Sequence, residues 1–569
     1  MKVLLRRWKA VSLFMLVAVP LLLAPLADAA ATGVVSGTVK GTDGAPFKGA
    51  FVRAQNQKTK INYIVLSDKQ GKYRFDDLAP GTYEVRASTV DFKTDPRSVS
   101  LAANRPSVLD FALQKADVHW PDISNQQGKM LLPDDPGKTV LFTRCMSCHG
   151  LQTKIAANRF NEAGWRAMIG LMRDPNGVGD TRITDHETDV LAPYLAKVFG
   201  LESEVSKSPE DLPGYAASKH PEFSDEAMKI KFVQYDLPLP NRIPWVATPN
   251  FHKEGNVWFV ESWGSNGFGK LVPDTGEIDE VHVDAPGRRH MLHIHSASEG
   301  PDGLVWFAEA NRCQLNSYNP ATKKISSYVP PSCGQKAGNG DEGGDGPSEV
   351  RVDKLGNVWA NAGNLWRFDP KTEKFTEFPE GGDAYGFVLD DKDGNVFFAQ
   401  LWAGQIGEVD IKTLKLKRWI PPSTLRLAEQ NKNQPDEVGN TQVHPKVAGP
   451  RRISSDSKGM IWFGEWFAGQ LGRFDPATET FTEFPLPGPS PTPYGVGVDA
   501  NDNVWYASYD TDVLGRLDPK TGKVTEYPLP YSGNEIREIL QDVDGRMWFG
   551  TSFNNKVGYF IPPDGLKKK

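Results

Sequence analysis

A hydrophobic residue followed by a Trp or Phe, usually with a second aromatic residue, recurs seven times in the C-terminal part of the chain. Each copy lies between a turn rich in Gly or Asn and a turn of the type Gly-x-(Asp)-Pro-x-Thr, and the copies begin at Asn256, Leu304, Asn357, Asn395, Met460, Asn503 and Met547. Their spacing, mostly 38 to 65 residues, is too long for one hairpin and suits a four-stranded blade. Seven blades in a closed ring leave no exposed sheet edge. The pattern predicts a seven-bladed β-propeller over residues 223–565.

One strand before the first copy has no turn of its own. The run Lys231–Asp236 reads as a short strand. We expect it to complete the last blade beside Lys556–Phe560, which would lock the ring.

Two other patterns precede the propeller. Residues 31–116 contain short alternating strands separated by Gly, Asp and Pro turns, which favours a β-sandwich. Residues 117–205 carry apolar positions at helical spacing, most clearly over Phe160–Arg173 and Thr184–Phe199. The fold class is therefore multidomain and mainly β, with a small all-α domain between two β domains.

The first thirty residues have the pattern of a cleaved signal peptide. A basic start is followed by the apolar run Val11–Ala27 and the small-x-small sequence Ala27-Asp28-Ala29. We expect a periplasmic or secreted protein without a permanent membrane anchor, because the apolar run is short and broken by Pro20 and Pro25. Removal of the leader leaves 61 basic against 70 acidic residues, which makes nucleic acid an unsuitable partner.

The helical region contains the sequence Cys145-Met-Ser-Cys148-His149. Two thiols separated by two residues and followed by histidine are the attachment signature of one covalent haem c. Cys145 and Cys148 would bind the vinyl groups, and His149 would supply the proximal nitrogen to iron. The alternatives are a chance spacing or a thioredoxin-type redox pair, but a redox pair would follow a strand in a βαβ unit.

The other two cysteines, Cys313 and Cys333, lie close in sequence. A disulfide between them suits an oxidising compartment, and a free buried pair is the alternative. The loop Gly338–Gly346 gathers Asp341, Glu342 and Asp345, which would bind calcium or form a solvated acidic loop. The polar insert 426–446 is expected to cover one face of the propeller.

Two resemblances concern the N-terminal half. The runs Gly71–Phe75 and Leu78–Glu84 resemble the carboxypeptidase regulatory-like domain family, whose modules are usually non-catalytic. The haem motif with its following helices is similar to small cytochrome c domains. That resemblance implies a distal methionine after a Trp-containing helix, and Met172, seven residues after Trp165, matches best. Met168, His186 and an iron open to ligands remain alternatives.

The repeats resemble the virginiamycin B lyase (streptogramin lyase) family of seven-bladed propellers, notably at Ile461–Trp466 and Gln470–Pro476. The resemblance implies metal-dependent elimination by proline-linked histidines and a glutamate. The two best-matching positions hold Arg451 and Tyr494 instead, so the lyase chemistry is in doubt.

Alignment of the repeats predicts which side chains each blade presents to the mouth of the channel: Trp245, His295, Ser348, Tyr385, Arg451, Tyr494 and Arg537. Behind them stand Glu261, Glu309, Gln400 and Glu465. A rim of arginines and aromatic residues suits an anionic or aromatic organic substrate. His295 is predicted to titrate near neutral pH and to act with Glu309, as a catalytic pair or as ligands of a divalent metal; a structural histidine is the alternative.

These observations predict a periplasmic c-type cytochrome that transfers electrons, with a propeller that binds an organic substrate or a redox partner protein. A lyase or hydrolase with an accessory haem domain and a non-catalytic binding propeller are the other interpretations.

Overall fold

A computed structural model describes residues 32–147, 149–174, 183–203, 205–251, 253–262, 265–284, 292–309, 312–336, 349–362, 364–382, 384–390, 392, 394–434 and 446–568. The leader, Cys148, Ser348 and the acidic loop at 341–345 lie outside these residues, as does much of the insert after residue 434. No helix within the described ranges is long and apolar enough to cross a membrane.

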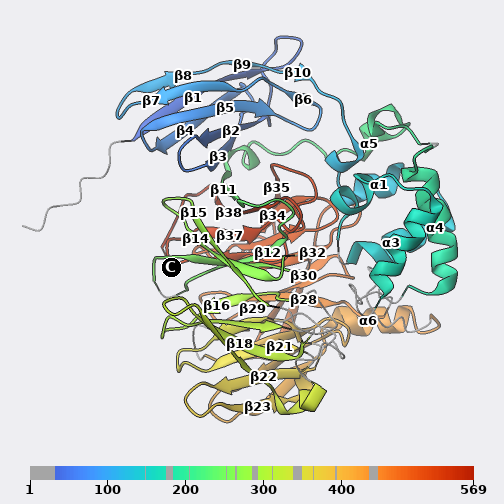
Figure 1. The fold of residues 1–569 in the computed structure, drawn as a ribbon, viewed down its shortest axis with the longest axis vertical. Helices are drawn as coiled ribbons and strands as arrows, with labels where there is room; N and C mark the ends of the chain where they lie inside the picture. Colours follow the sequence, from blue (N-terminus) through green and yellow to red (C-terminus); the bar gives the residue numbers. More distant parts are fainter. Residues whose placement is uncertain are drawn as a thin grey trace, which may run out of the picture.

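The C-terminal part forms a β-propeller (Figure 1). Six separate four-stranded antiparallel sheets follow one another along the chain. Their strands are β12 (Pro244–Pro249), β13 (Val257–Glu261), β14 (Gly267–Val272), β15 (Glu277–His282); β16 (Ala297–Glu299), β17 (Val305–Glu309), β18 (Gln314–Asn319), β19 (Lys324–Tyr328); β20 (Val350–Val352), β21 (Val358–Ala362), β22 (Asn364–Asp369), β23 (Lys374–Phe378); β24 (Ala384–Leu389), β25 (Val396–Gln400), β26 (Gln405–Val409), β27 (Leu416–Trp419); β28 (Pro450–Ser455), β29 (Ile461–Glu465), β30 (Gln470–Asp475), β31 (Thr480–Pro485); and β32 (Pro493–Val498), β33 (Val504–Ser508), β34 (Val513–Leu517), β35 (Val524–Pro528). The seven aromatic repeats supply the second strand of each blade, including β37 below.

A repeated hydrogen bond explains why the repeats contain tryptophan. In four blades the indole N–H donates to an aspartate six residues earlier, as Trp505 does to Asp499 at 2.8 Å and Trp548 to Asp542 at 2.7 Å. The same aspartates accept backbone N–H groups of the turn between the first two strands. Each pair therefore satisfies a buried indole and fixes the turn at once.

The strand before the first repeat closes the ring, as the sequence predicts. The last blade combines the final three strands with this early strand. Its order is β36 (Leu540–Gln541), β37 (Met547–Gly550), β38 (Lys556–Ile561) and β11 (Lys231–Asp236). β11 is antiparallel to β38, with Phe232 opposite Phe560. This unit lies between the blades that begin with β32 and β12.

β11 also pairs with a strand of the N-terminal domain, which the sequence did not predict. Its other edge is antiparallel to β3 (Ile61–Leu66), with Phe232 opposite Ile64. One ten-stranded sheet therefore runs from the N-terminal domain into the propeller. The pairing covers the outer edge of β11, which would otherwise expose unpaired backbone groups.

The N-terminal domain is a sandwich-like arrangement of two sheets. One contains β1 (Gly33–Lys40), β4 (Lys72–Leu78), β8 (Pro106–Val108) and β9 (Phe111–Ala112). The other contains β2 (Phe51–Asn56), β3, β5 (Gly81–Ser88), β6 (Phe92–Lys93), β7 (Arg97–Leu101) and β10 (Gln114–Lys115). Alternate residues such as Val52, Phe75 and Val85 meet between the sheets in one core.

Between the two β parts lies a small helical segment. Its helices are α1 (Asn125–Leu131), α2 (Pro136–Arg144), α3 (Glu162–Arg173), α4 (Asp185–Phe199) and α5 (Tyr215–Ser218), with short helical turns at Trp120–Asp122, Cys145–Ser147, Gln152–Ala156, Pro209–Asp211 and Ala227–Lys229. α3 and α4 confirm the helices predicted over 160–173 and 184–199. Thr184 and Glu187 form a reciprocal capping box that starts α4. α2 crosses α4 closely because Gly137 has no Cβ, which would lie 2.3 Å from Cβ of Tyr194.

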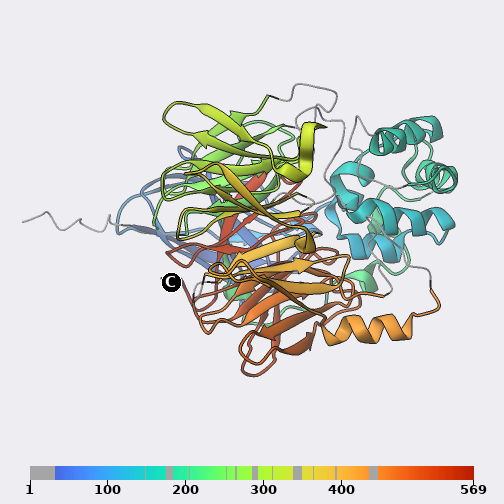
Figure 2. The same ribbon diagram turned by 90° about the horizontal axis from the view of Figure 1, so that it is seen from below.

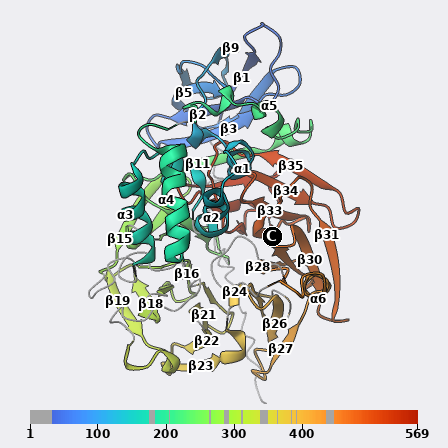
Figure 3. The same cartoon turned by 90° about the vertical axis from the view of Figure 1, so that its right-hand side faces the viewer.

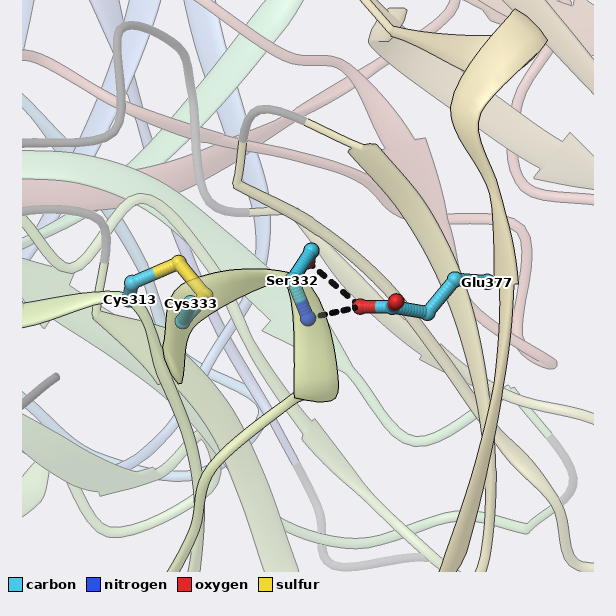
Figure 4. Close-up of a disulfide and its surroundings, with 4 residues drawn as sticks. All are labelled: Cys313, Ser332, Cys333 and Glu377. Carbon is cyan, nitrogen blue, oxygen red and sulfur yellow. Dashed lines mark hydrogen bonds between the residues drawn. A yellow bond between two sulfur atoms is a disulfide. The ribbon is translucent and has the colours of Figure 1, made fainter. Parts of the chain in front are cut away.

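The helical segment lies over part of one face of the propeller (Figures 2 and 3). α6 (Pro422–Gln430) projects from the same side of the propeller. It includes the first residues of the insert 426–446, and residues 435–445 lie outside the described residues, so the expectation that the insert covers a face stays a prediction. On the second blade, Cys313 and Cys333 are joined in a disulfide with their Cα atoms 5.9 Å apart (Figure 4). The neighbouring Ser332 donates its N–H, at 3.1 Å, and its hydroxyl to Glu377 of β23, which ties this loop to the next blade.

Candidate functional site

Four side chains predicted for the rim meet at the centre of the propeller. Tyr385, Arg451 and Tyr494 come from the first strands β24, β28 and β32, and Arg537 precedes β36. The hydroxyl oxygens of Tyr385 and Tyr494 lie 2.5 Å apart. Arg451 Nη2 donates to the Tyr385 hydroxyl at 2.7 Å, and Arg537 Nη1 donates to the Tyr494 hydroxyl at 2.9 Å. We call these four residues the Arg/Tyr cluster.

Aromatic rings sandwich both guanidinium groups of the cluster. The guanidinium carbon of Arg451 lies 3.6 Å from the ring centre of Tyr494 and 4.2 Å from that of Trp466. That of Arg537 lies 4.1 Å from the ring centre of Trp245. Such stacking stabilises desolvated cations, and it leaves the in-plane N–H groups available to anions.

Irregular strand starts explain why these residues point inward. The pairing of β28 with β29 shifts register between Pro450 and Ile453, and β12, β24 and β32 show the same irregularity at their first residues. An extra residue in a strand redirects its side chains. Arg451 and Arg452, which would alternate in a regular strand, therefore both contribute to the buried centre of the propeller.

A second group of buried charges lies next to the cluster, and we call it the Arg/Glu network. Arg452 Nη1 lies 2.7 Å from Glu349, and Arg351 Nη2 lies 2.6 Å from Glu349 and 2.8 Å from Glu538. Burial, together with Glu538, raises the pKa of Glu349 to about 8. These four residues were not predicted from the sequence. Their signal there is the presence of charged residues inside first-strand runs such as Glu349–Asp353.

His295 belongs to this network and is not a neutral-pH base. Arg452 Nη2 donates to the ring at 2.9 Å from Nδ1. Burial, followed by repulsion from Arg452, lowers the pKa of His295 well below its usual value. The prediction that His295 titrates near neutral pH is therefore wrong, and the imidazole is neutral. His293 lies beside it, with ring centres 5.9 Å apart.

Glu309 and Glu465 each accept a hydrogen bond inside the propeller. Glu309 accepts the backbone N–H of His293 at 2.7 Å. Glu465 accepts from Gln470 at 2.5 Å, and burial raises its pKa to about 7. Among the described residues, no group of three or more His, Cys, Asp or Glu side chains is arranged to hold a metal ion.

The segment that follows Cys145–His149 contacts the propeller through Gly150. Gly150 N–H donates to Glu535, which also accepts the Tyr509 hydroxyl at 2.9 Å and lies 3.4 Å from Arg537. Nearby, the Gln126 N–H donates to the Asp510 carbonyl at 2.8 Å. The packing of the helical segment on the Arg/Tyr side of the propeller was not predicted from the sequence.

Cys145 and His149 follow α2, and the candidate second ligands lie in α3 and α4. Cys145 is half-buried at the end of α2. The ring Nδ1 of His149 lies 3.2 Å from the carbonyl oxygen of Gly150, and burial lowers the pKa of His149 to about 4. Met172 is half-buried in the last turn of α3, Met168 packs against the helical core, and His186 is exposed at the start of α4.

Two family models match parts of the chain. Residues 34–114 match the carboxypeptidase regulatory-like domain, and residues 426–566 match the virginiamycin B lyase family. The propeller is virginiamycin B lyase-like. Neither match includes the helical segment, and the comparisons give no evidence for a cytochrome c domain.

Solved structures of the same kind are similar to the propeller. A streptogramin B lyase is 19% identical with a TM-score of 0.48, over 60% of this chain and 100% of that one. Virginiamycin B lyase from Staphylococcus aureus is 19% identical with a TM-score of 0.46, over 58% of this chain and 99% of that one. A catalytically inactive form of that enzyme with quinupristin is 20% identical, with the same TM-score and coverage. A comparison with curated proteins gives no match.

Proposed function

We propose that this chain is an exported c-type cytochrome that carries one covalent haem at Cys145, Cys148 and His149. We further propose that a seven-bladed propeller, closed by β11, binds a small organic anion or a redox partner beside it. The main supporting observation is the position of His149, which is half-buried next to Gly150, whose N–H donates to Glu535 on the Arg/Tyr side of the propeller. A haem at this place would supply one-electron chemistry next to the cluster.

The residues present fit such a group. A ligating histidine normally donates its second ring N–H to a carbonyl or carboxylate, and the Nδ1 of His149 lies 3.2 Å from the Gly150 carbonyl oxygen. A low pKa keeps the imidazole neutral, as a metal ligand must be. Cys145 stands four positions before it, directly after α2. Cys148 lies outside the described residues, so its position adds nothing to this fit.

Met172 is our proposed second axial ligand. Its place in the last turn of α3 leaves it outside the apolar core of the helical segment, whereas Met168 packs against that core. A thioether ligand favours the ferrous state. Met172→Ala is expected to abolish the sulfur-to-iron charge-transfer band and lower the midpoint potential, both measured by spectroelectrochemistry. Met168→Ala serves as the matched control and should leave both nearly intact; the opposite pattern would assign the ligand to Met168.

The Arg/Tyr cluster is our proposed site for the organic anion. Arg451 is 5% exposed, and within the described residues no carboxylate lies at ion-pair distance from it. A buried guanidinium without a carboxylate is suited to an anionic partner. An aromatic acid would also use the surrounding rings.

A screen of periplasmic extract fractions for compounds that reduce the haem tests this site. Arg451→Ala is expected to lower the apparent affinity for the reducing compound at least tenfold. A tenfold change corresponds to about 1.4 kcal/mol, and a hydrogen bond to a charged group contributes more than that. Arg473→Ala, on the outer part of the same blade, is the control and should change nothing. If the propeller is an enzyme, His295→Ala is expected to lower turnover but spare haem content, because it removes the ring that contacts Arg452 beside the cluster. Unchanged reduction in both Arg451→Ala and His295→Ala would exclude this face of the propeller.

A lyase or hydrolase with an accessory haem domain is the second candidate, favoured by the family match over residues 426–566. It predicts cleavage of a cyclic ester substrate with no change in haem oxidation state. A divalent metal held by His295 and Glu309 would be part of this second candidate function. A propeller that binds without turnover is the third interpretation.

A further inference from the structure

The two hydroxyl groups at the centre of the Arg/Tyr cluster are unusually close. The oxygens of Tyr385 and Tyr494 lie 2.5 Å apart. Two neutral hydroxyls usually lie about 2.7 to 2.8 Å apart. A hydroxyl donating to an oxyanion is shorter, at about 2.5 to 2.7 Å. The distance is that of a hydroxyl and an oxyanion.

The surrounding donors leave room for one proton only. The Tyr385 oxygen already accepts from Arg451 and the Tyr494 oxygen from Arg537, at 2.7 and 2.9 Å. In the part of the chain that the structure describes, the other tyrosine oxygen is the single acceptor recorded for either hydroxyl. Two neutral tyrosines would therefore leave one O–H without an acceptor among these groups, whereas a single shared proton leaves none.

The charge of the cluster points the same way. Arg351 and Arg452 face the two carboxyl groups of the Arg/Glu network, and Arg537 faces Glu535. Arg451 faces no carboxylate among the described residues, and its Nε has no hydrogen-bond partner there. A buried cation without a counter-charge is strongly unfavourable. A negative charge on the tyrosine pair would supply one.

We propose that Tyr385 and Tyr494 hold a single proton between them at neutral pH, so that the pair is a resident phenolate base of the propeller site. The base role rests on the organic ligand site proposed above. Tyr494 is completely buried, whereas Tyr385 is partly exposed. A ligand O–H or C–H therefore gives its proton to the Tyr385 oxygen as the Tyr385 proton moves to Tyr494. The electron pair of the broken bond stays on the ligand, whose anion Arg451 holds.

The electrostatic surroundings agree with this assignment. Burial raises the pKa of Tyr494, but Arg451, Arg537 and Arg452 outweigh it and lower that pKa to about 7. The pKa of Tyr385 rises to about 12, chiefly through burial. The titratable and charged groups that face the pair are Arg451 and Arg452 from β28, Arg537 and Glu535 before β36, Tyr509 after β33, and His295 before β16.

A pH titration of the full-length protein tests the proposal through the ultraviolet phenolate band. We expect one phenolate per chain to form with a midpoint near pH 7, far below an ordinary tyrosine. Tyr494→Phe should remove it. Tyr506→Phe is the matched control, because Tyr506 is equally buried and its pKa is raised, and it should keep the band.

Arg451→Met adds a variant that keeps both hydroxyls, and it should raise the midpoint by about one to three pH units. Absence of any phenolate below pH 9 in the unmodified protein, or a band that survives in Tyr494→Phe, would overturn the proposal. The titration needs no ligand and no change of haem oxidation state. Its failure would therefore leave the haem and the ligand site of the proposed function standing.

Discussion

The double substitution Cys145→Ser, Cys148→Ser is expected to give exported protein with no covalently bound haem. Serine oxygens do not form the thioether bonds that hold a haem c, and His149 alone would not retain the group through denaturation. Haem-dependent peroxidase staining after a denaturing gel measures the loss, and the intact mass of the chain confirms it.

The other thiol pair provides a matched control. Cys313→Ser, Cys333→Ser changes the same atoms on the second blade, so haem content should remain that of the unmodified protein. Loss of this disulfide should instead lower the free energy of unfolding, by about 3 kcal/mol for a loop of this length. Unmodified protein that binds no haem when exported from a host competent for cytochrome c maturation would refute the assignment of the motif.

The repeats made the propeller predictable because the same aromatic second strand recurs in every blade and the same turn contact recurs in four of them. An apolar second strand and an aspartate that binds both a turn and a tryptophan recur at fixed offsets, as in Asp499 and Trp505. The closing strand was also predictable, since Lys231–Asp236 had no partner of its own. The pairing of β11 with β3 was not, because two strands from different domains carry no shared pattern.

The site was predictable in part for a similar reason. The residue after each strand-starting proline could be aligned between repeats, which identified Arg451 and Tyr494. The bulge that turns Arg452 inward as well breaks the alternation on which such an alignment depends. The pKa of His295 required the position of Arg452, which lies 157 residues away in the chain. A contact between two residues this far apart in the chain leaves no local pattern in the sequence.

Arg452→Met is expected to cost the folded protein about 3–5 kcal/mol. Arg452 is 1% exposed and binds Glu349, the carbonyl oxygen of Tyr385 and His295. Its removal leaves buried carboxyl groups with one cation fewer, and breaking a buried ion pair from one side costs this much. Urea unfolding followed by tryptophan fluorescence measures the loss. Arg426→Met, which breaks the exposed pair with Glu483, should cost no more than about 1 kcal/mol.

The pH dependence separates a lost charge from lost packing. Arg452 lowers the pKa of Glu349, so its removal raises that pKa further above about 8. A carboxyl whose pKa is higher in the folded than in the unfolded protein stabilises the fold as it takes up its proton. The cost of Arg452→Met should therefore be largest above the raised Glu349 pKa of the variant and shrink as the pH falls to about 8, below which Glu349 is protonated in both folded proteins. An equal cost at both ends would mean that Arg452 acts through packing, and the Arg/Glu network would then carry no charge coupling to the tyrosine pair beside it.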